Sequence, residues 1–216
     1  MDPNEILARI RATGIIPVIR APSTEEALAA VEAMRAGGID VVEITMTVPS
    51  ALAVIEQVVE RHGDAIVVGA GTVLDADTAR ACISAGAMFV VSPIVDAATI
   101  RACRSDGVPV MPGALTPTEV VGAWRAGADL VKVFPCGAVG GASYIKALRA
   151  PLPQIELVPT GGVTLATVGD FIAAGASAVG AGADLVDLAR LRRGEHAALT
   201  ENARRYVAAV QQARKA

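Results

Sequence analysis

Hydrophobic residues along this chain gather in short runs rich in Val and Ile, and each run is followed by a polar turn and an Ala-rich amphipathic segment. Apolar positions in these segments recur with the spacing of a helix, whereas the runs themselves suit buried strands. The runs occupy residues 15–21, 41–46, 66–73, 89–93, 108–115, 130–135, 155–162 and 178–186. The pattern therefore predicts eight β-strands that alternate with helices.

The boundaries between these elements carry recognisable signals. In front of the first run, Asp2 suits an N-cap, Pro3 the first helical position and Glu5 the third, and Gly14 suits the end of a short helix. Glycines in a left-handed conformation are expected after six of the later helices, in RAGGI, RHGDA, SAGAM, SDGVP, RAGAD and AAGAS. Punctuation this regular indicates one repeating unit.

Eight such units predict an α/β protein, a (β/α)8 TIM barrel with an extra N-terminal helix, in which residues 1–216 form a single domain. The alternative is an open doubly wound sheet. No GxGxxG motif follows the first run, and the strand count does not stop at five or six, so the barrel is favoured.

Composition narrows the class of partner. The chain is 53 % hydrophobic but only 3 % aromatic, so Ala, Val, Ile and Leu must build the core. A net charge of -3 without any basic run argues against nucleic acid and membrane surfaces, which leaves small molecules or further copies of the chain. The three cysteines form no CxxC or Cys/His cluster, and neither a targeting segment nor an apolar run of about 18 residues is present. We expect a cytoplasmic protein without a metal site.

Strand alternation places two charged residues inside the predicted barrel. On the sixth run, Lys132 and Phe134 share one face, and the valines between and before them suit the helix-packed face. On the second run, the same alternation directs Glu43, Thr45 and Thr47 inward. A lysine and a carboxylate would then share one interior.

Lys132 admits two interpretations. A structural ion pair with Glu43 is one, although desolvation makes such a pair a poor way to stabilise a core. The other is chemical, since an apolar environment lowers the pKa of the amine and makes it a nucleophile toward a carbonyl. The remaining lysines, Lys146 on a predicted surface helix and Lys215 beside the C-terminus, need no such role.

The chain resembles the 2-keto-3-deoxy-6-phosphogluconate (KDPG) / 4-hydroxy-2-oxoglutarate (KHG) aldolases. The likeness covers nearly the whole sequence, through PVIRA (17–21), AGGIDVVEITMTVPSA (36–51), VGAGTVLDADTA (68–79), FVVSP (89–93), MPGALTPTE (111–119), VKVFPCGAVGGASYIKAL (131–148) and VPTGGV (158–163). Ordered motifs on seven predicted strands are far more specific than a single signature.

The resemblance implies a class I aldolase that needs no metal or other cofactor and assembles as a homotrimer. Such an enzyme cleaves a 2-keto-3-deoxy sugar acid phosphate to pyruvate and glyceraldehyde 3-phosphate, and it could also cleave 4-hydroxy-2-oxoglutarate to pyruvate and glyoxylate. Lys132 matches the family's Schiff-base lysine and Glu43 its general acid/base. Four further positions match the lining of the family's pyruvate pocket, namely Thr72, Pro93, Phe134 and Thr160.

Substrate anions would need their own partners. In part of the family an arginine stands four residues after the glutamate, where this chain has Thr47, so Arg20 is the candidate clamp for the pyruvate carboxylate. Backbone amides after the last two strands are the candidate phosphate site, at Gly161, Gly162, Gly180 and Gly182. Many family members have serine where this chain has Ala183, which removes one hydroxyl donor.

Two alternatives follow from that departure and from the fold. One is a related pyruvate-dependent aldolase or 2-oxo-acid decarboxylase that acts on an unphosphorylated or differently configured substrate. The other is a non-catalytic oligomeric barrel, against which the presence of both Lys132 and Glu43 argues. Cys136 is expected to be a pocket-wall residue, because His62 and His196 lie in or beside predicted surface helices and are not placed to activate it.

Overall fold

A computed structural model describes residues 1–215 as an alternation of strands and helices. The strands are β1 (Ile15–Ile19), β2 (Val41–Thr45), β3 (Val67–Gly71), β4 (Phe89–Val91), β5 (Val110–Met111), β6 (Gly113–Ala114), β7 (Val131–Val133), β8 (Leu157–Pro159) and β9 (Val179–Ala181). The helices are α1 (Pro3–Thr13), α2 (Thr24–Ala36), α3 (Ala51–His62), α4 (Ala76–Ser84), α5 (Ala97–Ser105), α6 (Pro117–Arg125), α7 (Ala142–Arg149), α8 (Val168–Ala173), α9 (Leu188–Arg192) and α10 (His196–Ala213), with short 3-10 turns η1 (Gly63–Ala65) and η2 (Cys136–Val139).

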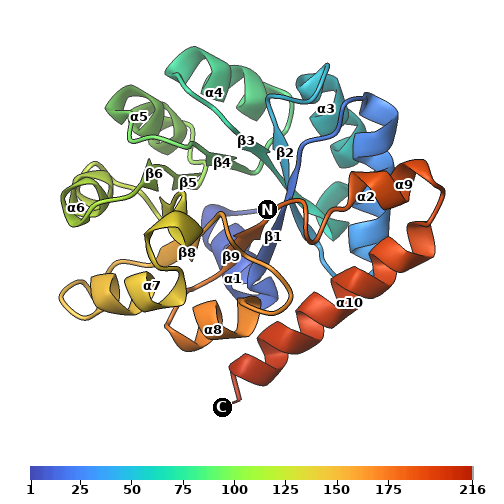
Figure 1. Ribbon diagram of the computed structural model, residues 1–216. Helices are drawn as coiled ribbons and strands as arrows, with labels where there is room; N and C mark the ends of the chain where they lie inside the picture. Colours follow the sequence, from blue (N-terminus) through green and yellow to red (C-terminus); the bar gives the residue numbers. More distant parts are fainter. Residues whose placement is uncertain (216) are drawn as a thin grey trace.

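The strands form a curled parallel sheet with the helices around it (Figure 1). Hydrogen bonds join them in the orders β5-β4-β3-β2-β1-β9 and β6-β7-β8, and all of these pairs are parallel. A single parallel bridge between Thr160 and Gly180 connects the end of β8 to β9. The fold is therefore α/β, as the alternating pattern predicts.

The fifth run, predicted as one strand within residues 108–115, is divided into two strands in the structure. Pro112 separates β5 from β6, because proline has no amide hydrogen to contribute to a ladder. Gly113 donates its amide hydrogen to the carbonyl of Ile94, and the carbonyl of Pro112 accepts from Lys132 on β7. The two halves of this run thus pair with different neighbours, β4 on one side and β7 on the other.

Helix α1 has the boundaries that the sequence predicts. The side chain of Asp2 accepts hydrogen bonds from the amides of Asn4 and Glu5, Glu5 completes the capping box, and Gly14 ends the helix with φ 71°. Its buried residues pack against inward-facing strand residues at the amino-terminal end of the sheet, in a cluster made of Ile6, Leu7, Ile10, Ile16, Val41, Val67, Phe89, Val91, Met111, Leu130, Val158 and Ala178. α1 therefore closes this end of the sheet.

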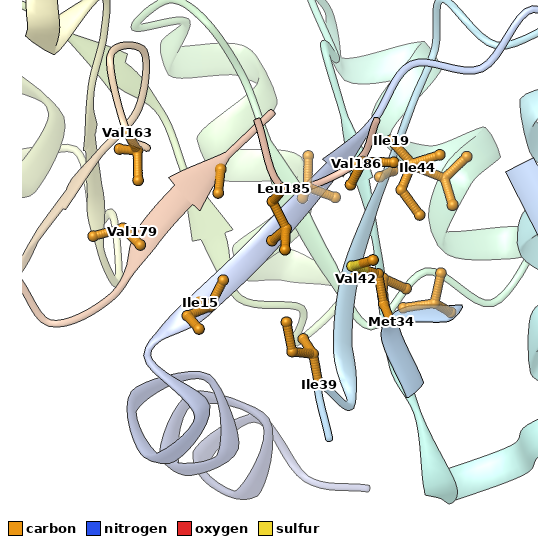
Figure 2. Packing of buried hydrophobic residues seen from close by; sticks show 14 of the residues in the cluster. Ile15, Ile19, Met34, Ile39, Val42, Ile44, Val163, Val179, Leu185 and Val186 are labelled. Atoms are coloured by element: carbon orange, nitrogen blue, oxygen red, sulfur yellow. The ribbon is translucent and has the colours of Figure 1, made fainter. Parts of the chain in front are cut away.

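A second and larger cluster packs the outer face of the strands against the surrounding helices. Figure 2 shows a part of it, in which Val42 and Ile44 of β2 and Ile15 and Ile19 of β1 lie among side chains such as Met34 of α2. The glycines expected after six helices all have positive φ, at Gly38, Gly63, Gly86, Gly107, Gly127 and Gly175. Within residues 1–215, no helix has both the length and the apolar character needed to cross a membrane.

Candidate active site

Lys132 and Glu43 both lie inside the curled sheet. Lys132 on β7 is 3 % exposed and Glu43 on β2 is 2 % exposed. The residues on either side of Lys132, Val131 and Val133, belong to the cluster that packs against the helices, whereas Leu130 belongs to the interior cluster. The inward register predicted for β7 is confirmed, and the same separation of faces holds along β2.

Burial shifts the charge balance of both side chains. Desolvation lowers the pKa of the Lys132 amine, against the attraction of Glu43, and the charge of Arg20 lowers it further. Desolvation also raises the pKa of the Glu43 carboxyl, against the attraction of Lys132 and Arg20. Both groups are therefore driven toward their neutral forms, an amine that can attack a carbonyl and an acid that can give up a proton.

The two groups do not form the ion pair that was the alternative interpretation of Lys132. Among residues 1–215, no oxygen of Glu43 lies within 4.0 Å of the Lys132 amine in a salt bridge, and Glu43 Oε1 is buried without a hydrogen-bond partner. An unpaired buried carboxylate oxygen is costly in a purely structural setting.

Seven of the predicted site residues line one cavity of about 310 Å³ at the carboxyl ends of β1, β7, β8 and β9. These residues are Arg20, Phe134, Thr160, Gly161, Gly162, Gly180 and Gly182. Arg20 is the charged donor of this set, and its Nη1 lies 3.6 Å from where a Cβ atom at Gly182 would stand. The guanidinium therefore reaches from the end of β1 across to the end of β9.

Thr47 lies outside this lining and is tied to Thr45. Thr45 is fully buried and donates its hydroxyl hydrogen to the carbonyl of Ile19 at 2.9 Å. Its oxygen also lies 2.7 Å from Thr47 Oγ1. Because Thr45 has one hydroxyl hydrogen, Thr47 must be the donor in the second bond. Thr47 thus has no hydroxyl hydrogen left for a substrate carboxylate.

Thr72 and Pro93 stand at the ends of neighbouring strands, also outside this lining. Thr72 follows β3 directly and has φ 61°, a conformation that non-glycine residues rarely adopt. Pro93 follows β4 and packs against Gly113, where a Cβ atom would lie 2.8 Å from Pro93 Cα. Thr72, Pro93 and Thr47 thus lie just beyond the ends of β3, β4 and β2, outside the lining that the seven residues share.

Several lining residues were not predicted from the sequence. Val18 lies two residues before Arg20, so the alternation along β1 was a usable signal for it. Val163 and Thr164 come from loops, for which no periodic signal exists. Asp184, which follows Ala183 and is expected near the phosphate site, also lines the cavity. Asp184 accepts hydrogen bonds from the amide of Leu165, at 2.9 Å, and from the hydroxyl of Tyr206. Its carboxylate is thereby held by protein donors beside the predicted phosphate loops.

The loops after β7 and β8 are joined through their backbones. Gly161 and Gly162 have φ of 86° and 79°, and the amide of Gly137 donates to the carbonyl of Gly161 at 2.8 Å. A Cβ atom at Gly162 would lie 2.7 Å from the Cα atom of Gly137, so the close approach needs glycine. This contact fixes the glycine loop relative to the strand that carries Lys132.

Cysteine and histidine side chains do not form a second reactive centre. Burial raises the pKa of the Cys136 thiol to about 11, so the thiol stays protonated at neutral pH. His62 pairs with Glu32 at 3.0 Å and has a side chain only 9 % exposed, less than expected of a surface helix, whereas His196 is exposed. Among residues 1–215, no group of three or more His, Cys, Asp or Glu side chains is arranged to hold a metal ion.

Several known proteins are similar to this chain over most of its length. The family model for KDPG and KHG aldolases matches residues 6–202. The chain is 36 % identical over 163 residues to the 2-dehydro-3-deoxy-phosphogluconate aldolase of Pseudomonas aeruginosa, covering 76 % of this chain and 74 % of that one. It is 37 % identical over 172 residues to the 2-dehydro-3-deoxy-6-phosphogalactonate aldolase of Escherichia coli, covering 79 % and 83 %.

A solved structure adds chemical information about one relative. The KDPG aldolase of Legionella pneumophila, with pyruvate captured as a covalent carbinolamine intermediate, superimposes with a TM-score of 0.85 at 30 % identity, covering 92 % of this chain and 96 % of that one. This chain and the Legionella enzyme are thus similar in both sequence and fold over most of their lengths. The chain belongs to the KDPG and KHG aldolase family.

Proposed function

We propose that this protein is a class I aldolase, a lyase that cleaves 2-dehydro-3-deoxy-6-phosphogluconate to pyruvate and glyceraldehyde 3-phosphate. The observation that carries the proposal is the pair of buried groups, Lys132 with a lowered pKa and Glu43 with a raised one, inside the sheet of a member of this family. A neutral amine and a nearby proton carrier are what imine chemistry requires.

The reaction begins at Lys132. Its neutral amine attacks C2 of the substrate, a nitrogen–carbon bond forms as the carbonyl π bond breaks, and a proton passes from the nitrogen to the carbonyl oxygen to give a carbinolamine. Loss of water, with a proton supplied by Glu43, gives the protonated imine. Glu43 then removes the proton of the C4 hydroxyl, the C3–C4 bond breaks, and its electron pair passes to the imine nitrogen as the aldehyde leaves. Protonation at C3 and hydrolysis release pyruvate and regenerate the amine.

Arg20 is our candidate for the pyruvate carboxylate. Its guanidinium lines the same cavity as Phe134 and Thr160, and guanidinium groups bind carboxylates through paired hydrogen bonds. The hydrogen-bond geometry supports this choice over Thr47, whose hydroxyl hydrogen goes to Thr45. Thr72 and Pro93, at the adjoining strand ends, complete the proposed pyruvate pocket.

The substrate phosphate would bind at the glycines that line the cavity at the carboxyl ends of β8 and β9. These are Gly161, Gly162, Gly180 and Gly182, and glycine lets backbone amides approach phosphate oxygens. Ala183 also lines the cavity and supplies no hydroxyl. Lys132 and Glu43 would also support a second reaction, the cleavage of 4-hydroxy-2-oxoglutarate to pyruvate and glyoxylate. That substrate carries no phosphate and would leave the site beside these glycines unoccupied.

A second candidate function differs from the first in its substrate, either in the configuration at C4 or in the lack of a phosphate. The relative at 37 % identity is named for the phosphogalactonate substrate, and Ala183 favours an unphosphorylated acid, either as an aldolase or as a 2-oxo-acid decarboxylase. Turnover of the gluconate and galactonate forms, each with and without phosphate, separates these candidates. A non-catalytic oligomeric scaffold would turn over none of them.

We propose further that the two hydrogen-bonded sheets form one closed (β/α)8 TIM barrel within a single domain. Only Pro112 separates β5 from β6, and the bridge between Thr160 and Gly180 joins β8 to β9. In this proposal α1 is an extra helix that plugs the amino-terminal end of the barrel.

The oligomeric state and the compartment are two further parts of the proposal. Family resemblance supports a homotrimer, and sedimentation velocity tests this. The three cysteines form no disulfide among residues 1–215, which is in keeping with the reducing cytoplasm.

Reductive trapping tests the proposed imine. Wild-type protein and a Lys132→Ala variant are each incubated with pyruvate and borohydride, and the intact mass is measured. We expect a reduced pyruvate adduct on the wild type and none on the variant. A folded wild-type protein that gains no adduct would contradict the class I mechanism and restore the scaffold interpretation.

A further inference from the structure

The inward face of β3 carries no side chain beyond its first residue. Val67 belongs to the interior cluster, and the next two inward positions are Gly69 and Gly71. Ala70, between them, packs against the helices. Two alternate glycines leave a hollow along one wall of the interior, and a buried hollow in a close-packed protein must be filled by neighbouring side chains.

The lower part of this hollow is filled by Phe89. A Cβ atom at Gly69 would lie 2.5 Å from Cδ2 of the Phe89 ring and closer still to its neighbouring ring atoms. Phe89 is fully buried on β4, and its own strand partner is Gly69. The ring therefore occupies the space at the level of Gly69, which is also the strand partner of Glu43 on the other side.

The upper part of the hollow is filled by Glu43. A Cβ atom at Gly71 would lie 2.5 Å from Glu43 Cγ and would overlap Cδ and Oε1. Gly71 pairs with Thr45 rather than with Glu43, so the glutamate side chain leans toward the carboxyl end of the sheet, one inward position above its own strand partner. That is the end at which Arg20 and Thr160 line the cavity.

We infer that Gly71 is a positioning residue for the proton-transfer group of this enzyme. Its φ lies outside the left-handed range, so its backbone conformation suits alanine equally well, and the requirement for glycine is the space that Glu43 occupies. A methyl group at position 71 would displace the flexible end of Glu43, whose Oε1 accepts no hydrogen bond from residues 1–215. The inference rests on the proposed role of Glu43 in the aldol reaction.

A double-mutant cycle in kcat tests this inference. We expect Gly71→Ala to lower kcat for aldol cleavage by about 100-fold, the size of a lost general acid/base contribution. In a Glu43→Ala background the same substitution should change the residual kcat less than about twofold, because the group it displaces is gone. Gly122→Ala in α6 is the matched control, since a Cβ atom there meets nothing within 4 Å. Equal losses in both backgrounds, or no loss in the first, would overturn the inference.

Thermal unfolding tests the contact independently of activity. We expect Gly71→Ala to lower Tm by roughly 5 °C when Glu43 is present and by much less when position 43 is alanine, because overpacking destabilises only while both groups compete for the space. If the wild type traps no pyruvate, the proposed function fails, and the Tm cycle alone decides whether Gly71 accommodates Glu43. Equal Tm shifts in both backgrounds would then overturn the contact.

Discussion

The Lys132 amine lies 5.0 Å from the centre of the Phe134 ring, two residues further along the same face of the chain. An aromatic face attracts an ammonium group, whereas burial favours the neutral amine. The net effect is a lowered pKa for Lys132, with desolvation as the largest cause. Phe134 thus lines the cavity and also presents its ring to the Lys132 amine.

The rate of reductive trapping by pyruvate should show this balance. Only the neutral amine attacks, so the rate should rise with pH and level off above the pKa of Lys132, which is lowered from the 10.5 of an ordinary lysine. Phe134→Leu removes the stabilisation of the ammonium form, and the midpoint should move down by about half a pH unit. Phe134→Tyr, which keeps an aromatic face, is the control. An upward movement in the leucine variant would contradict the proposed contribution of the ring.

Stability should depend on pH through Glu43. Because its pKa is raised above 4.5, the folded protein holds this proton over a pH range in which the unfolded chain has lost it. Folding stability from this group is therefore present below pH 4.5 and is lost as pH rises through the folded pKa. Glu43→Gln removes the titration, so the free energy of unfolding of the variant relative to wild type should increase with pH above 4.5. Urea denaturation across this range measures the difference, and a constant difference would contradict the raised pKa.

Arg20 should control affinity for the pyruvate portion of the substrate. We expect Arg20→Met to raise the pyruvate concentration needed for half-maximal trapping by about 10- to 100-fold, because a charge-assisted pair of hydrogen bonds is lost. Thr47→Val should change it less than about twofold, since the Thr47 hydroxyl hydrogen is already used by Thr45. The reverse order of effects would assign the carboxylate to the end of β2.

The proposed phosphate site can be tested by adding a hydroxyl group beside it. Ala183→Ser restores the residue found in many family members at a position that lines the cavity. If phosphate binds there, kcat/KM for the phosphorylated substrate should rise by about 10-fold, the value of one hydrogen bond to a charged group. Turnover of 4-hydroxy-2-oxoglutarate, which has no phosphate, should stay the same. A gain on both substrates would point to a general effect on the loop.

Helix α1 should stabilise the fold without taking part in catalysis. Ile10 is fully buried in the interior cluster, at the amino-terminal end of the sheet. The cavity lies at the opposite, carboxyl end of the strands. Ile10→Ala should reduce the free energy of unfolding by about 3 kcal/mol, and Ile10→Val by about 1 kcal/mol. Urea denaturation measures both losses. The kcat of each variant should stay at the wild-type value at a temperature where the variant is folded, and a large loss of kcat would show that α1 supports the site.

Much of the site was predictable because strand alternation is a local property. The two-residue period of a strand sends Lys132 inward and its neighbouring valines outward, and it does the same for Glu43 on β2. The caps of α1 at Asp2 and Gly14 are equally local, since they depend on hydrogen bonds within a few residues. The sequence by itself thus determined the order of the elements, the ends of α1, and which two charged groups enter the interior.

Tertiary structure decided how these groups meet their surroundings. The division of the fifth run at Pro112 depends on which neighbouring strands its two halves reach. Glu43 contacts Gly71, Arg20 reaches toward Gly182, and Thr45 donates its hydroxyl hydrogen to the carbonyl of Ile19. Each of these contacts joins residues on different strands or just beyond their ends. The last one also decides that the Thr47 hydroxyl hydrogen goes to Thr45. The geometry of these contacts depends on register and on which side chain fills each space, and neither is encoded in a local pattern.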